Sequence, residues 1–593
     1  MDEHLPPAAL AAADDLVADF QRSAGAPGVA YGIVAGGALV HTAGYGQRWL
    51  GGPPPDAGTV FRIASMTKSF TAAAALALRD DGLLWLADPV LRFVPELSGM
   101  RQVSADAPDI TVQHLLTMTA GFPTDDPWGD RQQGLPLAEF AALLRRGVRQ
   151  AWAPGTCFEY SNLGYALLGR VIAAAAGTSY QDYVASRLLG PLGLDRTGYD
   201  SADFDPEELA RGYQRGLGPA DWAELLPDGN GAFAPMGGVF SCVRDLARWV
   251  TGLAGGFPAG AEADGGPHPL RRATRREMQL PQVAIPPYPA LPLPGGAGLG
   301  SQLSYGFGLF IEEHPAWGRL VFHGGGYPGF GSHMRWHPAS GRAVIVLANS
   351  TYAGAHTLAG QLLDVLLAAA PAPPAGQPRS RGPVPAPGTP WPETLQAQRT
   401  VTELLRSWDD AAAARLFTPN VAQDEPYPAR QEKAALTWER LGPPRDTGSR
   451  PAESDSPAHL RWWLHGERGD AAVEIKLTPE DPPRVQLLSL AVPPAWDSPL
   501  WRCTEALISL LNAGAPGWPA DLPVAERLDT ALLGRRLRTA GAWAGQCRAG
   551  ALRAGNGLNS VTVELDGEHA RLSLAVELDQ AQRLRRVDIA LLS

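Results

Sequence analysis

The first part of the chain contains a segment with a helical spacing of hydrophobic positions, followed by short β-prone runs. In residues 9–23, apolar side chains recur every three or four positions, which predicts an amphipathic helix. Residues 28–34 and 38–43 are short β-prone runs on either side of Gly36 and Gly37, which predicts a hairpin. The N-terminal region is therefore predicted to form a helix followed by two antiparallel strands.

Longer apolar segments predict further helices, and shorter ones predict strands. The predicted helices cover residues 66–78, 111–119, 163–176, 179–189, 241–253 and 358–369, with Ser179 and Ser241 as N-caps. The predicted strands cover residues 305–311, 320–322, 332–336 and 343–348. Because only short turns separate these strands, they predict an antiparallel meander, which the last helix closes.

Glycine and proline mark the boundaries between larger parts. Residues 259–300 are rich in both and predict a long surface loop. Residues 371–394 are proline-rich and predict a semi-rigid linker. Since 593 residues are too many for one hydrophobic core, we predict a main domain over residues 1–370 and two modules over residues 395–493 and 494–593.

The two modules repeat each other at a spacing of 101 to 102 residues. Residues 464–467 (Leu-His-Gly-Glu) recur as residues 565–568 (Leu-Asp-Gly-Glu), and the Thr-Glu pair at 402–403 recurs at 504–505. Each module is predicted to be a small α+β unit, with one or two helices before a meander of strands. Neither holds a recognisable catalytic set, so we predict accessory roles such as substrate gating, dimerisation or partner binding.

Composition narrows the classes of partner. The chain has 50 basic and 61 acidic residues, a formal net charge of −11 and a pI near 5.6. This balance argues against nucleic acid and against an anionic membrane, because both attract basic surfaces. We therefore expect a small-molecule or short-peptide substrate.

The N-terminal residues, the apolar runs and the cysteine spacing together indicate where the protein is located. Residues 1–7 lack the basic and apolar regions of a secretory signal, and no apolar run is long enough to cross a membrane. The four cysteines show no CxxC spacing, which favours reduced thiols over a disulfide framework or a zinc site. These features predict a cytoplasmic protein, although a mature chain without its signal would look the same.

Candidate chemistry begins with Ser65 and Lys68. Lys68 is the only lysine before Lys433, in a chain whose other positive charges are almost all arginines. A buried lysine can lose its proton and act as a base, whereas arginine stays charged. One helical turn separates the two residues, so the sequence predicts a nucleophile beside its base. The alternative is an N-cap serine followed by a surface lysine.

Two further stretches carry groups that suit such a site. Tyr160 and Asn162 lie two residues apart before an apolar helix, where a phenol could relay the proton of the serine and an amide could orient a partner. The alternative is a turn in which Asn162 caps the helix. His323 precedes Gly324, Gly325 and Gly326 at a strand edge, where backbone N–H groups could form an oxyanion hole.

The stretch that begins at His323 has two other interpretations. The glycines could form only a hairpin bend. His323, His333 and His337 are also close enough in sequence to raise the possibility of a metal site. The surroundings indicate strand and turn rather than a helix that presents two histidines on one face, so we predict no metal.

In this order, the three elements resemble the motifs of the serine β-lactamase and penicillin-binding-protein superfamily. The resemblance covers residues 9–372 and is strongest to the branch of class C β-lactamases, D-aminopeptidases and family VIII esterases. It implies an α+β sandwich, an antiparallel sheet flanked by helices, and no cofactor. By resemblance, Ser65 is acylated, Lys68 and Tyr160 handle its proton, and Asn162 contacts substrate.

The last motif of the family, Lys-Ser/Thr-Gly, aligns with His323, Gly324 and Gly325, and the resemblance assigns the oxyanion to the N–H groups of Ser65 and Gly326. Histidine replaces a lysine that holds the substrate carboxylate in the family. A histidine is mostly neutral at pH 7. We therefore expect ester or peptide substrates before β-lactams.

The sequence leaves the following hypotheses open. The leading one is a serine hydrolase that works through an acyl-enzyme on an ester or a peptide. A second is a non-catalytic receptor of the same fold that is acylated without turnover, and a third is a structural scaffold. Within the hydrolase hypothesis, Glu159 and Asn162 could also mimic the deacylating pair of class A enzymes.

Overall fold

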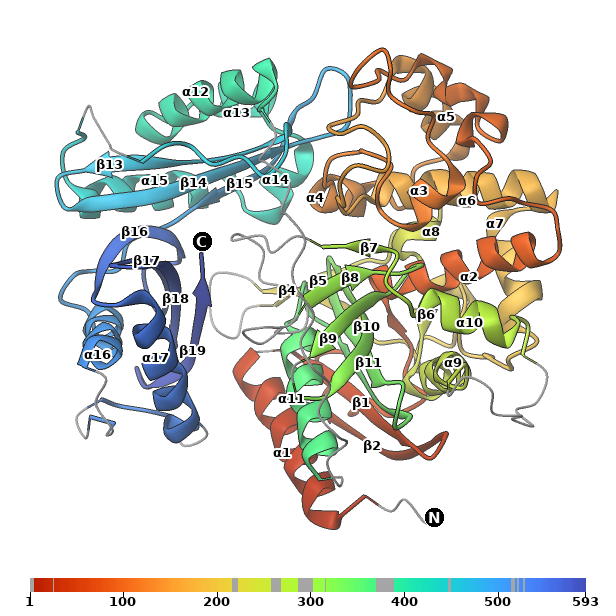
Figure 1. Cartoon of the computed structure of the whole chain (residues 1–593), viewed down its shortest axis with the longest axis horizontal. Helices are drawn as coiled ribbons and strands as arrows, with labels where there is room; N and C mark the ends of the chain where they lie inside the picture. Colours follow the sequence, from red (N-terminus) through yellow and green to blue (C-terminus); the bar gives the residue numbers. More distant parts are fainter. Residues whose placement is uncertain are drawn as a thin grey trace. The chain divides into compact units, whose positions relative to one another are not determined.

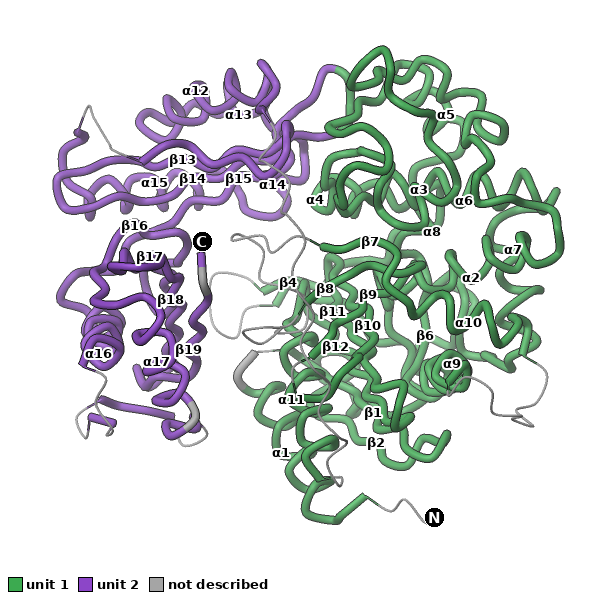
Figure 2. Tube along the Cα trace, in the orientation of Figure 1, with its two compact units in different colours: residues 1–287, 292–385, 479–481 green, residues 288–291, 386–478, 482–593 purple. Residues whose placement is uncertain are grey.

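The chain divides into two compact units (Figure 2). Unit 1 comprises residues 1–287, 292–385 and 479–481, and unit 2 comprises residues 288–291, 386–478 and 482–593. The computed structural model describes residues 5–24, 26–215, 222–257, 268–285, 302–314, 316–369, 389–445, 450–513, 518–519, 522–525 and 528–592.

Unit 1 is built on an eight-stranded sheet with the order β2-β1-β12-β11-β10-β9-β8-β7 (Figure 1). Every neighbouring pair is antiparallel, and the pairing of Val29 with Ala348 joins the N-terminal hairpin to the last strand. The prediction of an antiparallel sheet with flanking helices is therefore confirmed. The strands are β1 (Gly28–Ala35), β2 (Ala38–Gly46), β7 (Val283–Ala284), β8 (Gln302–Tyr305), β9 (Phe310–His314), β10 (Gly318–Tyr327), β11 (Phe330–His337) and β12 (Arg342–Ala348).

Helices and short turns complete unit 1. The helices are α1 (Pro7–Ala24), α2 (Thr67–Asp80), α3 (Val112–Leu116), α4 (Asp126–Gly129), α5 (Leu137–Arg146), α6 (Asn162–Ala176), α7 (Tyr180–Val184), α8 (Ala234–Gly237), α9 (Val243–Ala254), α10 (Arg272–Met278) and α11 (Ala355–Ala368). The single turns are η1 (Ala64–Met66), η2 (Val90–Arg92), η3 (Pro95–Gly99), η4 (Asp130–Gln132), η5 (Ala185–Leu189) and η6 (Ser201–Asp203). Two small sheets pair β3 (Phe61–Arg62) with β6 (Phe240–Ser241) and β4 (Gly212–Arg215) with β5 (Trp222–Leu225).

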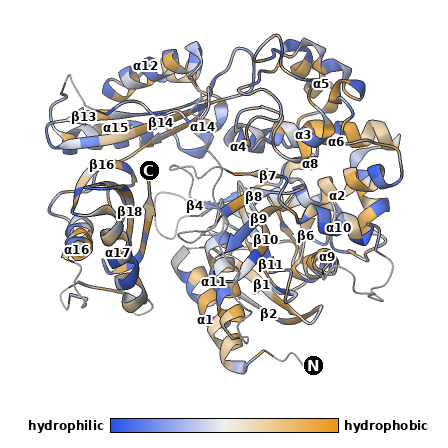
Figure 3. Ribbon diagram, in the orientation of Figure 1, coloured by the Kyte–Doolittle hydropathy of each residue, from blue (hydrophilic) through white to orange (hydrophobic). Residues whose placement is uncertain are grey.

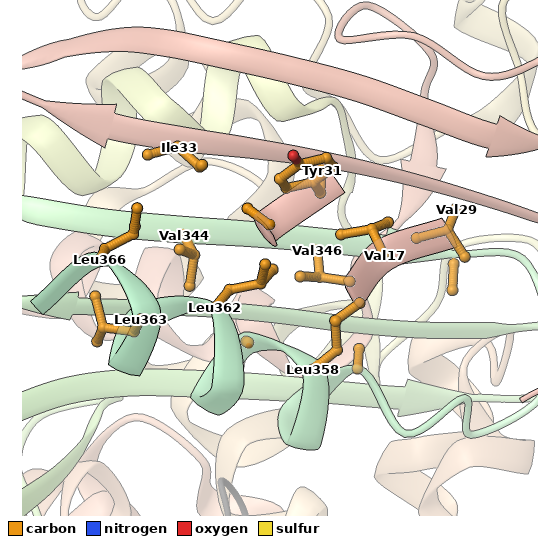
Figure 4. Packing of buried hydrophobic residues seen from close by; sticks show 14 of the residues in the cluster. Val17, Val29, Tyr31, Ile33, Val344, Val346, Leu358, Leu362, Leu363 and Leu366 are labelled. Atoms are coloured by element: carbon orange, nitrogen blue, oxygen red, sulfur yellow. The ribbon is translucent and has the colours of Figure 1, made fainter. Parts of the chain in front are cut away.

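One face of the large sheet is covered by α1 and α11, whose ribbons are largely in apolar colours in Figure 3. In Figure 4, leucines of α11 such as Leu362 face Val344 and Val346 of β12, and Val17 of α1 packs against the same cluster. The periodic apolar positions predicted for both helices form this core. In α2, every residue from Thr67 to Leu78 is buried.

Several predicted boundaries are wrong. The strand predicted over residues 305–311 is two strands, because a turn at residues 306–309 contains Gly308 at φ +71°. The strand predicted over residues 320–322 extends through the glycine run to Tyr327. Ser241 lies in β6, and Cys242 takes the N-cap position of α9 without a side-chain cap.

Three other predicted segments also differ. The helix predicted over residues 111–119 is only the five-residue α3, which ends before Met118 at φ +59°. Part of the predicted loop over residues 259–300 is regular, since α10 and β7 lie in it, and residues 259–267 and 286–300 fall outside the described residues. Most of the predicted linker is also outside them, and α12 already begins at Pro392.

Unit 2 contains one seven-stranded sheet, in which β13-β14-β16-β17-β18-β19 are consecutive and β15 also pairs with β14. Hairpin glycines in the two modules have equivalent surroundings. A Cβ on Gly466 would lie 2.5 Å from the carbonyl oxygen of Leu441, the last residue of α15, and one on Gly567 would lie 2.6 Å from that of Ala544, the last residue of α17. The elements are α12 (Pro392–Arg406), α13 (Asp410–Leu416), α14 (Pro419–Asp424), α15 (Tyr427–Leu441), α16 (Pro499–Ala513), α17 (Thr530–Ala544), β13 (His459–Gly466), β14 (Gly469–Leu477), β15 (Val485–Leu490), β16 (Cys547–Gly555), β17 (Ser560–Gly567), β18 (Arg571–Leu578) and β19 (Leu584–Leu591).

Within the part of the chain that the structure describes, no helix combines the length and the apolar character needed to cross a membrane.

Candidate active site

Ser65 lies in the single turn η1, between strand β3 and helix α2. The helix predicted over residues 66–78 is α2, which begins at Thr67, so Ser65 precedes it by one short turn. Ala64, directly before it, has φ +48°, a left-handed conformation that costs a residue with a side chain about 1 kcal/mol or more. Two contacts hold this turn: the N–H of Ile63 donates to the carbonyl of Val239 at 2.9 Å, and Ser332 Oγ donates to the carbonyl of Ile63 at 2.7 Å.

Lys68 lies one turn further on and has no exposed surface, so the alternative of a surface lysine is wrong. Its Nζ donates to Ser65 Oγ at 3.0 Å, to Asn162 Oδ1 at 2.7 Å and to the carbonyl of Met236 at 2.9 Å. Burial lowers the pKa of Lys68 to about 8, against the opposing effect of nearby aspartates. About a tenth of the amine is thus neutral at pH 7.

Tyr160 places its ring centroid 4.8 Å from Lys68 Nζ. Burial of the phenol raises the pKa of Tyr160 well above its usual value, and the charge of Asp126 adds to this effect, whereas an interaction with the Ser65 hydroxyl opposes it. Tyr160 therefore stays a neutral phenol, which can pass a proton on. The group that can take a proton from Ser65 is Lys68.

Asn162 is the first residue of α6, and its amide points to Lys68 instead of capping the helix. The cap is Ser161, whose Oγ accepts from the N–H of Gly164 at 3.1 Å, so the alternative of a capping Asn162 is wrong. Asn162 Nδ2 donates to Asp126 Oδ1 at 2.7 Å. With a donor contact on one side and an acceptor contact on the other, the orientation of this amide is fixed.

Three aspartates that the sequence analysis missed surround these groups. Asp125 is buried and accepts from the N–H groups of Asn162 at 2.6 Å and Leu163 at 2.9 Å. Asp126 holds the amide of Asn162, and the charges of Asp125, Asp126 and Asp130 all raise the pKa of Lys68. The available signal was three acids within six residues, in a segment that is otherwise mostly apolar.

The buried aspartates themselves are not ordinary carboxylates. Burial raises the pKa of Asp125 to about 7, although the two N–H donors oppose the shift. Burial also raises the pKa of Asp130 well above its usual value. Lys68 therefore titrates within a coupled group of acids rather than beside one fixed counter-ion.

The glycines after His323 allow strand β10 to approach the nucleophile turn. A Cβ on Gly325 would lie 2.2 Å from the carbonyl oxygen of Ile63 and 3.0 Å from the Cβ of Ala64. Real side chains do not tolerate such a contact with backbone, so the close approach requires glycine here. This places Gly325, and Gly326 next to it, beside Ser65.

His323 is buried and uncharged. Its Nδ1 lies 2.6 Å from the carbonyl oxygen of Gly324, and its Nε2 lies 3.4 Å from the hydroxyl of Tyr305. Burial lowers the pKa of His323 to about 3, and the nearby Lys68 contributes to the shift. This position therefore supplies no positive charge for a substrate carboxylate.

Two further alternatives concern a metal site and a deacylating role of Glu159. Among the described residues, no group of three or more His, Cys, Asp or Glu side chains is arranged to hold a metal ion. Glu159 accepts hydrogen bonds from the N–H of Thr124 at 2.8 Å and from the indole of Trp152. Through these two contacts, the Glu159 carboxylate holds nearby parts of the chain together.

Comparison with known proteins identifies relatives of unit 1. The family model described as Beta-lactamase matches residues 13–368. Penicillin-binding protein 4* of Bacillus subtilis (strain 168) is 25% identical over 340 residues, which cover 53% of this chain and 68% of that protein. The D-alanyl-D-alanine-carboxypeptidase/endopeptidase AmpH of Escherichia coli (strain K12) is 29% identical over 232 residues, 38% of this chain and 57% of that protein.

Two further proteins are similar to this chain. Protein flp of Staphylococcus aureus (strain NCTC 8325 / PS 47) is 30% identical over 230 residues, 38% of this chain and 45% of that protein. The chain thus spans about two thirds of the Bacillus relative and about half of the other two. The octameric penicillin-binding protein homologue from Pyrococcus abyssi is 18% identical and shares the fold, with a TM-score of 0.53 over 98% of each chain.

The family match covers more than half of the chain, and its span includes Ser65, Lys68, Tyr160, Asn162 and the glycine edge of β10. Among these relatives, one is named as a penicillin-binding protein and another as a D-alanyl-D-alanine-carboxypeptidase/endopeptidase. The chain therefore belongs to the beta-lactamase family, within the serine β-lactamase and penicillin-binding-protein superfamily.

Proposed function

We propose that this chain is a serine hydrolase that forms an acyl-enzyme on Ser65, with Lys68 as the base. The observation that carries the proposal is the buried Lys68 amine, 3.0 Å from Ser65 Oγ, whose pKa is lowered to about 8. A base with a pKa near the working pH combines the correct protonation state with a useful driving force for proton transfer.

In the proposed reaction, neutral Lys68 accepts the Ser65 proton while Oγ attacks the carbonyl carbon of the substrate. The N–H groups of Ser65 and Gly326 stabilise the negative oxygen that develops. When the bond to the leaving group breaks, Tyr160 gives its phenolic proton to that group and receives the proton held by Lys68. Water then attacks the acyl-enzyme with the same groups acting in the reverse direction.

The surroundings of His323 support an ester or a peptide as the substrate. Because its imidazole is neutral and buried, no cation occupies the place of the family lysine. A substrate whose binding depends on a carboxylate at this point would lose a charge-assisted hydrogen bond, worth about 1.5–3 kcal/mol. We therefore propose short-chain esters or short peptides, including D-amino-acid peptides, ahead of β-lactams.

Burst kinetics test the proposed function. Mixing the full chain with p-nitrophenyl acetate should release about one equivalent of nitrophenol quickly and then continue at a steady rate. Whole-protein mass should show one acetyl adduct on the wild type and none on Ser65→Ala. One equivalent without a steady rate would favour the receptor hypothesis, and no labelling would favour the scaffold.

The pH dependence should respond to Asp126. Its charge raises the pKa of Lys68, and asparagine at this position could still accept from Asn162. Asp126→Asn should therefore lower the pKa of Lys68 and move the acidic limb of kcat/KM to lower pH, by up to about one unit. Asp81→Asn is the matched control, since Asp81 is an exposed partner of Arg187. A shift to higher pH would contradict this assignment.

Unit 2 is proposed to be accessory to catalysis. Its two modules are proposed to gate substrate entry or to mediate self-association. The octameric Pyrococcus abyssi homologue, which aligns over nearly the whole chain, supports self-association.

A further inference from the structure

Tyr352 lies after β12, and two of its contacts connect it to the proposed acylation site. A Cβ on Gly326 would lie 2.5 Å from Tyr352 Cδ1, so the tyrosine ring lies against this glycine. The hydroxyl of Tyr352 donates to Asp130 Oδ2 at 2.5 Å. The side chain therefore bridges the glycine edge of β10 and the turn η4.

Both ends of this bridge are close to the reacting groups. Gly326 follows Gly325, which approaches the backbone of Ile63 and Ala64 directly before Ser65. Asp130 is buried, and its charge acts on both Lys68 and Tyr160. A group that joins Gly326 to Asp130 thus lies at the margin of the site.

Tyr352 keeps this position at an energetic cost. Its φ is +48°, a left-handed conformation that is unusual and unfavourable for an aromatic residue. The residue is also 48% exposed, so burial does not account for the strained backbone. Strained residues of this kind concentrate where function requires a fixed side chain.

We propose that Tyr352 is a specificity-determining residue that limits the size of the acyl group delivered to Ser65. The inference rests on the proposed acyl-enzyme and goes one step further. A substrate carbonyl held between the N–H groups of Ser65 and Gly326 directs its acyl chain past the ring of Tyr352. A short chain fits beside the ring, whereas a long chain must displace it and break the hydrogen bond to Asp130.

The test compares two esters that differ only in the acyl chain, p-nitrophenyl acetate and p-nitrophenyl hexanoate. The measured quantity is the hexanoate-to-acetate ratio of kcat/KM. Tyr352→Ala should raise this ratio by about tenfold or more, the size of discrimination that an apolar steric contact provides. Tyr352→Phe should raise it by only about two- to fivefold, because the ring stays and only the bond to Asp130 is lost.

Tyr45 provides a matched control. It is a partly exposed tyrosine of β2 whose hydroxyl also donates to an aspartate, Asp14, at 3.1 Å. Tyr45→Ala should leave the ratio within about twofold of the wild type. Should Tyr352→Ala fail to fold, Tyr352→Asn replaces it, since asparagine accepts a left-handed backbone.

The outcomes separate the two proposals. If the folded wild type turned over neither ester, the proposed function itself would be overturned. Turnover by the wild type with an unchanged ratio in folded Tyr352→Ala or Tyr352→Asn would overturn the role of Tyr352 and leave the hydrolase intact. An equal rise of the ratio in Tyr45→Ala would also overturn it, because the effect would then not depend on the site.

Discussion

Lys68→Arg is expected to lower kcat/KM for p-nitrophenyl acetate by about 10³-fold at pH 8, within the range contributed by general bases. Arginine keeps the positive charge but stays protonated at every working pH. It also has no room, because the ammonium of Lys68 is fully buried among Ser65, Asn162 and the carbonyl of Met236. Steady-state kinetics measure the loss, and thermal unfolding checks that the variant is folded.

The pH profile gives the same assignment an independent test. Since a neutral amine is required and the pKa of Lys68 is about 8, activity should rise with pH and level off above about pH 8. At pH 7 about a tenth of the amine is neutral, so kcat/KM should rise by up to tenfold from pH 6 to pH 7. Ionisation of Asp125, whose pKa is about 7, raises the pKa of Lys68 and makes this rise less steep. The pKa of His323, lowered to about 3, adds no second limb in this range.

Lys433→Arg is the control for this experiment. Lys433 pairs with Glu425 on a half-exposed surface of unit 2, and arginine can make the same ion pair. Its kcat/KM and pH profile should match the wild type. If Lys68→Arg retained more than about a tenth of the activity with an unchanged acidic limb, Lys68 would not be the base.

The residues that sequence reasoning placed well are those whose chemistry is unusual in this chain. The only lysine in the first 432 residues indicated a proton-transfer role, and Lys68 is buried against Ser65. A run of three glycines after a histidine indicated close backbone approach, and Gly325 lies against Ile63. In both cases an unusual residue composition carried the signal.

Long-range packing decided what the sequence analysis missed. Asp126 acts on Lys68 only because α4 meets the start of α6, and Tyr352 reaches Asp130 across 222 residues of chain. The turn that separates β8 from β9 exists because Gly308 packs on the backbone of Lys68, where a Cβ would lie 2.5 Å from its carbonyl oxygen. None of these contacts leaves a periodic pattern in the sequence.

Gly325→Ala is expected to have the second-largest effect on catalytic activity, because a single methyl group would move the N–H of Gly326 away from Ser65. The new Cβ would lie 2.2 Å from the carbonyl oxygen of Ile63 and 2.3 Å from Ser332 Oγ. The hydroxyl can rotate away, but the carbonyl belongs to the backbone of the turn that carries Ser65, so β10 or that turn must move. Overpacking of this kind costs about 1–3 kcal/mol of stability.

Gly325→Ala should lower the catalytic rate even where the variant remains folded. A displacement near 1 Å between the N–H of Gly326 and Ser65 lowers the rate about 10²-fold, so kcat should fall by that order while KM changes little. Gly229→Ala is the matched control, since an exposed glycine with open space around its Cβ should tolerate the methyl group in both assays. Urea unfolding and steady-state kinetics on both variants separate the two costs. A Gly325→Ala variant with wild-type kcat would show that β10 does not supply the oxyanion donor, and the second N–H would have to come from another part of the site.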